Sequence, residues 1–150
     1  MTGTEPARLP VTAEQLAFLD EPRFAVVATV GADGLPHQTV MWYERDGDSL
    51  VLSTPSGSRK HRDLARDRRM SVCVEDGFRY VTLSGTVTVD DTDPVAARER
   101  YARIGQRYAG ALGGGGGRRA PLDPKAAELL SRDRVTLRLV VDHVHSNGFG

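Results

Sequence analysis

The stretch from Arg69 to Val89, RMSVCVEDGFRYVTLSGTVTV, decides the fold class of this chain. On both sides of a central Asp76-Gly77 pair, apolar residues occupy alternate positions: Met70, Val72, Val74, Val81 and Leu83. A period of two is the pattern of a β-strand with one face toward a core, and Asp-Gly is a strong turn signal. The sequence therefore predicts two strands, Arg69 to Glu75 and Arg79 to Val89, joined by a tight turn. Gly85, inside the second strand, indicates a bulge or bend of the kind that barrels need at corners.

Outside this pair, four further segments combine β-forming residues with flanking turn residues. They are Arg23 to Val30, Leu35 to Glu44, Ser49 to Thr54 and Arg134 to His143. The first three follow one another through short turns, which implies an antiparallel sheet. Helical patterns run from about Thr12 to Leu19, from Arg59 to about Arg66, from Pro94 to Tyr108 and from Pro124 to Leu130. Six mostly antiparallel strands with a few short helices predict a mainly β (α+β) fold, a closed or partly closed six-stranded barrel.

Length and composition fit one small cytoplasmic domain. The 150 residues predict a single domain over residues 1–150, with residues 1–10 as a flexible N-terminal segment. The glycine run from Gly113 to Gly117 predicts a flexible loop over about residues 113–120, as a linker or as a lid. The net charge of +0 argues against broad electrostatic binding to nucleic acid or a membrane. One cysteine, no signal peptide and no apolar run of about 20 residues indicate a soluble protein in a reducing compartment.

The densest basic segment directly follows a predicted strand and a hydroxyl-rich turn. The hydroxyl residues are Ser53, Thr54 and Ser58, and the basic residues after them include Arg59, Lys60 and Arg62. Helix N-termini bind phosphate through free N–H groups and the helix dipole, and hydroxyl and cationic side chains complete such a cradle. The order of strand, turn and basic helical turn therefore fits a phosphate site. It also fits a solvent-exposed surface helix, and spacing alone does not separate the two interpretations.

Aromatic residues and histidines supply the other candidates. Trp42 lies at the end of the second predicted strand, while Phe78 and Tyr80 flank the turn of the opening stretch. An isoalloxazine-like ring needs a flat apolar wall, which such residues provide, although core packing explains each of them singly. His37 lies on a predicted strand, where it would border a pocket or the surface. The two histidines of the last strand lack a third ligand nearby, so no metal site is predicted.

Motifs of self-contained catalysis are missing, and the order of several segments resembles one known family. There is no nucleophile elbow, Walker loop, dinucleotide fingerprint or paired-cysteine motif, which favours chemistry carried by a cofactor. The segments that carry the resemblance are RFAVVATV at 23–30, DGLPH at 33–37, VLST at 51–54, RKHRDLARD at 59–67 and YVTLSG at 80–85. Together they resemble the pyridoxamine 5'-phosphate oxidase-like split β-barrel superfamily, and most closely its actinobacterial F420-dependent reductase branch. The resemblance covers about residues 14–145 and implies an FMN-binding split-barrel type of fold.

The resemblance also implies where a cofactor would bind. It implies a homodimer with two equivalent sites at the subunit interface, each built from both chains. The cofactor phosphate would lie on the segment from Ser53 to Arg62, with Lys60 as a principal contact and the acidic tail of F420 within reach of arginines. Some relatives have arginine where this chain has Ser58. The implied cofactor-binding residues are Ser53, Thr54, Ser58, Arg59, Lys60, Arg62, His37, Thr39, Met41 and Trp42, with Phe78 and Tyr80 presented by the partner subunit.

The function expected from this resemblance is an F420-dependent oxidoreductase that transfers a hydride between a deazaflavin and a conjugated small molecule. No covalent catalytic residue is expected, and His37 and Tyr80 both fit the role of proton donor. Because the chain ends at Gly150, without the C-terminal Arg/His motif of true pyridoxamine phosphate oxidases, oxidation of that substrate is not expected. An FMN-dependent flavoprotein and a non-catalytic flavin or tetrapyrrole carrier remain alternatives. A nucleic-acid binder that uses the basic cluster from Arg59 to Arg69 is disfavoured by the neutral net charge.

Overall fold

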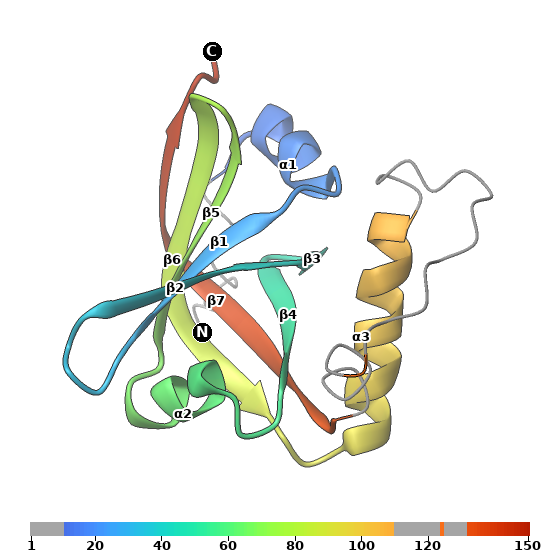
Figure 1. Ribbon diagram of the computed structural model, residues 1–150. Helices are drawn as coiled ribbons and strands as arrows, with labels where there is room; N and C mark the ends of the chain where they lie inside the picture. The colour runs from blue at the N-terminus through green and yellow to red at the C-terminus, as the bar shows by residue number, and fades with distance from the viewer. Residues whose placement is uncertain (1–10, 110–123, 125–131) are drawn as a thin grey trace, which may run out of the picture.

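The structure is a computed structural model that describes residues 11–109, 124 and 132–150. In these residues one seven-stranded antiparallel sheet is flanked by three helices (Figure 1). In chain order the elements are α1 (Ala13–Asp20), β1 (Ala25–Val30), β2 (Pro36–Met41), β3 (Glu44–Asp46), β4 (Ser49–Pro55), α2 (Arg59–Arg66), β5 (Arg69–Asp76), β6 (Arg79–Asp90), α3 (Pro94–Ala109) and β7 (Arg134–Asn147). The strand order is β2-β1-β5-β6-β7-β4-β3, and every neighbouring pair is antiparallel. The predicted mainly β class is confirmed.

The two strands predicted from the opening stretch form the middle of the sheet as β5 and β6. Their register runs from Arg69 opposite Thr86 to Asp76 opposite Arg79. The turn contains Gly77 at a φ of 64°, a left-handed conformation that favours glycine. The alternating apolar side chains of both strands are buried in one core with side chains of β1, β4 and β7. The local pattern therefore predicted both the pairing and the buried face.

The number of strands differs from the prediction. The strand predicted from Leu35 to Glu44 ends at Met41 as β2, and its last predicted residue, Glu44, begins the additional strand β3, at the opposite edge of the sheet. Trp42 and Tyr43 connect them outside either strand, because both are held by the same residue of α3: the Trp42 ring stacks on Tyr108, and the Tyr43 N–H donates to the Tyr108 hydroxyl at 3.1 Å. The Tyr43 N–H is thus bonded to a side chain of α3 and not to a neighbouring strand, and β2 ends at Met41. The sheet has seven strands. Its two edge strands, β2 and β3, are joined by Trp42 and Tyr43 but do not pair with each other.

The bulge predicted at Gly85 is present. The register between β6 and β7 shifts between Ser84 and Gly85, so that Asp142 on β7 has no counterpart. The strands approach so closely there that a Cβ on Gly85 would lie 1.9 Å from the carbonyl oxygen of Val140. Only glycine fits this position without a shift of the backbone.

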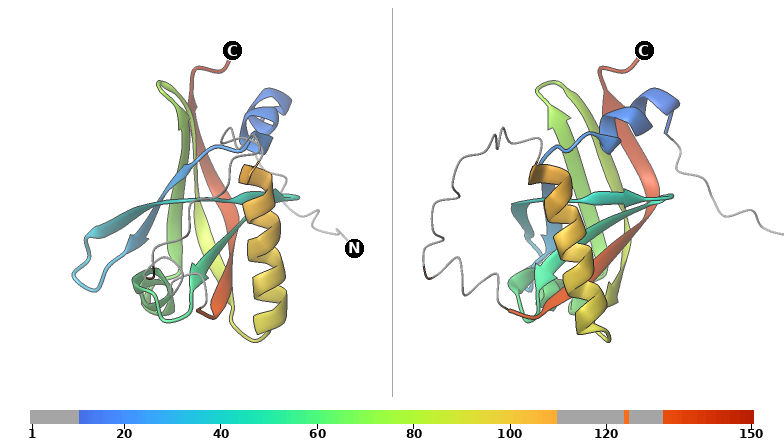
Figure 2. Two further views of the ribbon diagram at one scale, coloured as in Figure 1. Left: turned by 45° about the vertical axis from the view of Figure 1, so that its right-hand side comes forward. Right: turned by 90° about the vertical axis from the view of Figure 1, so that its right-hand side faces the viewer.

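The helices cover different parts of the sheet. Figure 2 shows α3 lying along β4 and β7, with α2 at the ends of β1 and β4. At the N-terminal end of α1, Thr12 and Gln15 form the predicted capping box, and each side chain bonds the backbone N–H of the other. The three helices predicted before residue 110 are therefore confirmed. The predicted N-terminal segment, the Gly113 to Gly117 loop and nearly all of the helix after Pro124 lie outside the described residues.

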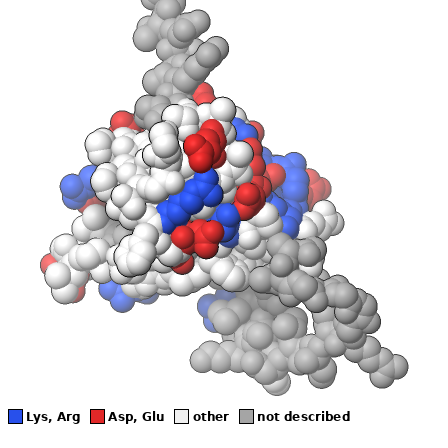
Figure 3. Space-filling model, turned by 90° about the horizontal axis from the view of Figure 1, so that it is seen from above, with Lys and Arg blue, Asp and Glu red and all other residues white. Residues whose placement is uncertain are grey.

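The end of the molecule that carries α1 has charges of both signs side by side (Figure 3). Arginines there pair with acidic residues of α1 or its C-terminal end: Arg45 with Asp20, Arg79 with Glu14 and Arg23 with Glu21. These positive charges therefore have negative partners on the same face.

Candidate cofactor site

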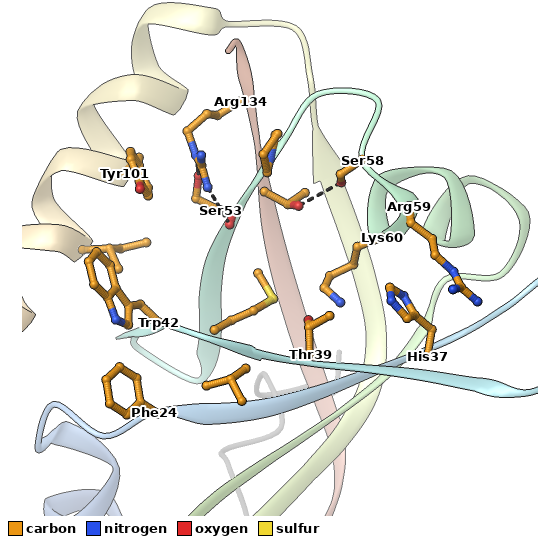
Figure 4. A pocket seen from close by; sticks show the side chains of 15 residues that line it. Phe24, His37, Thr39, Trp42, Ser53, Ser58, Arg59, Lys60, Tyr101 and Arg134 are labelled. Carbon is orange, nitrogen blue, oxygen red and sulfur yellow. Dashed lines mark hydrogen bonds between the residues drawn. The ribbon is translucent and has the colours of Figure 1, made fainter. Parts of the chain in front are cut away.

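A cavity of about 410 Å³ opens where β2, the β4–α2 turn, α3 and the start of β7 meet (Figure 4). Its volume lies in the range of small-molecule sites. The predicted site residues that line it are His37, Thr39, Met41, Trp42, Ser53, Thr54, Ser58, Arg59 and Lys60. They come from two separate segments of the chain, 37–42 and 53–60, which the fold brings together.

The turn between β4 and α2 places hydroxyl groups at the cavity wall. Gly57 adopts a φ of 76°, which lets the chain reverse into the helix. Ser58 is the N-cap of α2, and its Oγ accepts a hydrogen bond from the His61 N–H at 3.2 Å. The Thr54 and Ser58 hydroxyl oxygens lie 2.9 Å apart in a shared hydrogen bond. The hydroxyl-rich turn predicted from sequence is therefore a structured rim of the cavity.

Lys60 is the most unusual side chain of the site. It is only 4% exposed, and its Nζ has no hydrogen-bond partner. Burial lowers the pKa of its ammonium group, an effect that the charge of Asp63 partly offsets and that of Arg59 adds to. The His37 Nδ1 and Thr39 Oγ1 atoms are also buried without a hydrogen-bond partner, and Figure 4 shows both side chains beside Lys60. The Lys60 ammonium and the Thr39 hydroxyl, which lie at one cavity wall, therefore indicate a site prepared for a polar ligand group.

Asp63 lies behind this wall and is 2% exposed. Its Oδ2 accepts a hydrogen bond from the Thr29 hydroxyl at 3.0 Å, and its Oδ1 accepts one from Arg66 at 2.5 Å. The His37 Nδ1 lies 3.4 Å from Asp63 Oδ2. One buried carboxylate thus faces both His37 and Lys60. It supplies the negative charge that lets cations remain in this wall.

A stack of three aromatic rings forms the opposite, apolar wall. The Tyr108 ring lies between those of Trp42 and Phe24, with centroid distances of 5.1 and 6.0 Å and interplanar angles of 12° and 18°. Trp42 and Phe24 line the cavity together with Met41 and the α3 residue Ile104. A flat apolar surface beside a cationic wall suits a ring system that carries an anionic tail.

The remaining wall is formed by Arg134 of β7 and Tyr101 of α3. The Arg134 Nε donates to the Ser53 Oγ at 2.7 Å, and its guanidinium carbon lies 3.7 Å from the centre of the Tyr101 ring. Sequence reasoning missed both residues. Tyr101 lies within the helical pattern predicted from Pro94 to Tyr108, and Arg134 is the first residue of a predicted strand, so neither position signalled a role in a site.

Three predicted site residues lie outside this cavity. Arg62 lines a separate hollow with Arg66, because residues two apart on a helix point in nearly opposite directions and Lys60 takes the inner side. Phe78 is 91% exposed in the β5–β6 turn, and the Tyr80 hydroxyl lies 3.2 Å from His145 Nε2. The expectation that these two aromatic residues serve a partner subunit's site stays a prediction.

Neither a metal nor a membrane site emerges from the described part of the chain. It holds no group of three or more His, Cys, Asp or Glu side chains arranged to bind a metal ion. None of its helices is long and apolar enough to cross a membrane.

The fold and the cavity define a class: a split β-barrel protein with a cavity of the size of small-molecule sites. The chain belongs to the pyridoxamine 5'-phosphate oxidase family, whose sequence model matches residues 11–148. This agrees with the resemblance noted in the sequence.

Individual relatives bear the names of different activities. The chain is 31% identical over 97 residues to the F420H(2)-dependent biliverdin reductase of Mycobacterium tuberculosis, covering 63% of this chain and 70% of that protein. It is 31% identical over 115 residues to the pyridoxine/pyridoxamine 5'-phosphate oxidase of Kineococcus radiotolerans, covering 75% of this chain and half (50%) of the relative. A solved structure described as an F420 reductase superposes with a TM-score of 0.69 at 24% identity, over 90% of this chain and 98% of that one, which supports the fold.

Proposed function

We propose that this protein is an F420-dependent oxidoreductase that transfers a hydride between the deazaflavin and a conjugated small molecule. One observation carries the proposal: the buried, unpartnered ammonium of Lys60 faces a cavity whose other wall is aromatic. The resemblance to the F420H(2)-dependent relative supports the choice of deazaflavin over FMN.

Each part of the cofactor has a matching wall. Lys60, Thr39 and the hydroxyl groups of the β4–α2 turn would hold the phosphate, since an anion satisfies the ammonium and the orphan hydroxyl together. Trp42 and Met41 would flank the ring system. Arg59 and Arg62 lie at a neighbouring hollow, where they would meet the acidic tail.

The protein's own contribution is binding, orientation and a proton. Hydride for addition to an electron-poor double bond is the chemistry that a reduced deazaflavin supplies when bound. The cavity walls orient the reactants and exclude water. Of the two candidate proton donors, His37 lines the cavity of its own subunit, while Tyr80 would act only in the partner subunit's site. We assign the proton to the His37 imidazole, because the buried Asp63 carboxylate faces it at 3.4 Å.

We also propose that the protein is a homodimer in which Phe78 and Tyr80 complete the partner subunit's site. Phe78 is a large apolar side chain left 91% exposed, and Val40, on the edge strand that lines the cavity, is 65% exposed. Sedimentation equilibrium should show a dimer that Phe78→Ala weakens. Val95→Ala, which trims an exposed apolar residue on α3, is the matched control. A monomeric wild-type protein would exclude this arrangement.

Separate titrations of F420 and FMN test the function. Trp42, the chain's one tryptophan, lines the cavity, so its fluorescence reports on occupancy. We expect F420 to bind and Lys60→Ala to weaken it roughly 10- to 100-fold, through loss of a charge-assisted hydrogen bond. Arg69→Ala removes an exposed positive charge outside this cavity and should leave the affinity unchanged.

The outcomes separate the alternatives. Protein that purifies yellow and retains FMN through gel filtration would support the flavoprotein alternative. Tight cofactor binding without turnover of enones, quinones or bilins would support a carrier. If neither cofactor binds, or if Lys60→Ala changes nothing, the assignment of the site is wrong.

A further inference from the structure

A second cationic side chain, Arg134, is fixed at the cavity wall by contacts from two other elements. Its Nε donates to the Ser53 hydroxyl at 2.7 Å, and its Nη2 donates to the Ser53 carbonyl at 3.2 Å. The guanidinium also lies over the Tyr101 ring at 3.7 Å, a cation–π distance. A long flexible side chain held on two sides is ordered before any ligand arrives, which lowers the entropy cost of binding.

The charge of Arg134 has no anionic partner in the described residues. None of their carboxylates forms an ion pair with it, in contrast to Arg100 and Arg138, which both pair with acidic residues. Burial lowers the pKa of the Arg134 guanidinium, and Tyr101 offsets only part of this effect. A desolvated cation is costly unless an anion compensates it. A cavity that has a desolvated cation in its wall is therefore prepared to bind an anionic group.

The geometry of the free donors favours a planar anion. A guanidinium carries five N–H groups, and the two hydrogen bonds to Ser53 use two of them. The Tyr101 ring covers one face, so a ligand would approach along the edge, where arginine pairs with carboxylates in a fork. The Ser53 hydroxyl accepts from Arg134, which leaves its own hydrogen to donate to the same group.

We propose that Arg134, with Ser53 and Tyr101, binds a carboxylate of the substrate, so that the protein acts on conjugated carboxylic acids. This rests on the proposed function, because it assigns the cofactor phosphate to Lys60. Figure 4 shows the two cations on separate walls, Arg134 beside Tyr101 and Lys60 beside Thr39 and His37. The same cavity is lined by Met41 and Trp42, which would flank the cofactor ring, and by Ile104 of α3. An apolar conjugated substrate body that lies against the cofactor ring and ends in a carboxylate matches this arrangement.

Calorimetric titration of trans-cinnamate and of its uncharged methyl ester tests the proposal, with and without oxidised F420. We expect the wild-type protein to bind the acid about tenfold more tightly than the ester, because only the acid has a carboxylate that can pair with Arg134. Arg134→Gln should reduce this preference to within about twofold. Arg134→Lys, which keeps the charge and loses the fork, should retain only part of it and serves if the glutamine variant does not fold.

Arg138→Gln is the matched control on the same strand. Arg138 pairs with Asp46 and does not line the cavity, so its loss should leave the preference for the acid unchanged. Three results would overturn the proposal: no preference for the acid in the wild type, a preference that survives in both Arg134 variants, or competition between cinnamate and F420. Competition would assign Arg134 to the cofactor instead.

The proposed function is tested separately by the F420 titration. If F420 does not bind the wild type while the acid still binds better than the ester, the cofactor assignment fails and the carboxylate site stands. If F420 binds, its binding depends on Lys60, and the acid binds no better than the ester, the cofactor assignment stands and the carboxylate site fails.

Discussion

The Thr29 hydroxyl donates a hydrogen bond of 3.0 Å to Asp63 Oδ2, and both residues are almost completely buried. This contact joins β1 to α2, the helix that carries Lys60. The same carboxylate accepts a hydrogen bond from Arg66 and faces His37, so it both holds α2 against β1 and supplies negative charge to the cavity wall.

Asp63→Asn should therefore destabilise the protein. The amide keeps the shape of the carboxylate and removes its charge, leaving the cations around it uncompensated, at a cost of about 3 kcal/mol. Urea denaturation measures the change. Asp48→Asn, in the exposed β3–β4 turn, is the control and should have almost no effect. Equal effects of the two substitutions would show that Asp63 has no special role.

The stability of the ligand-free protein should depend on pH through Lys60. Burial lowers the pKa of Lys60 in the folded state below its ordinary value of 10.5, so the unfolded chain binds more protons between the two values. Stability therefore rises with pH across this window. The comparison is with Lys60→Met: the stability deficit of the wild type relative to this variant should shrink as the pH rises toward 10.5. A difference that stays constant with pH would contradict the burial of a charged ammonium.

Gly85→Ala should be severely destabilising. Its Cβ would lie 1.9 Å from the Val140 carbonyl oxygen, so β6 and β7 must separate, at a cost of about 3 kcal/mol or more. Gly105→Ala on α3 is the matched control, because its Cβ would meet the Trp42 ring at an ordinary 3.7 Å. That change should stabilise the helix by about 0.5–1 kcal/mol. Thermal unfolding should show a lower melting temperature for Gly85→Ala and a higher one for Gly105→Ala than for the wild type.

Tyr108→Phe should loosen the link between α3 and the rest of the fold. The Tyr108 hydroxyl donates to the Arg23 carbonyl at 2.6 Å and accepts from the Tyr43 N–H at 3.1 Å. Its loss leaves buried backbone groups unsatisfied, at about 1–3 kcal/mol. Hydrogen exchange at the Tyr43 amide should become faster. The ring stack beside the cavity is kept, so unchanged exchange would mean that stacking alone holds the connection.

Local sequence patterns were sufficient for much of the fold. The alternation around Asp76-Gly77 predicted β5 and β6, since strand period and turn chemistry depend on neighbouring residues. The wall from Ser53 to Lys60 could be predicted for the same reason: a strand, a turn and a helix start lie within eight residues of one another.

Contacts between distant residues set the rest. The break between β2 and β3 depends on Tyr108, 65 residues from Tyr43, and nothing in the segment itself marks it. Arg134 meets Ser53 across 81 residues, and only the pairing of β4 with β7 brings them together. Arg62 lies outside the cavity because Lys60, two residues earlier on α2, occupies the side of the helix that faces the cavity.

The link at Trp42 and Tyr43 also bears on solubility. A sheet that does not close leaves two rows of unpaired backbone groups, and such edges invite aggregation with other chains. Here both edges limit that risk: β3 is three residues long and entirely charged, as Glu44, Arg45 and Asp46, and β2 begins with Pro36. The sheet thus stays open between β2 and β3, beside the cavity, while its edges offer another chain few backbone groups with which to pair.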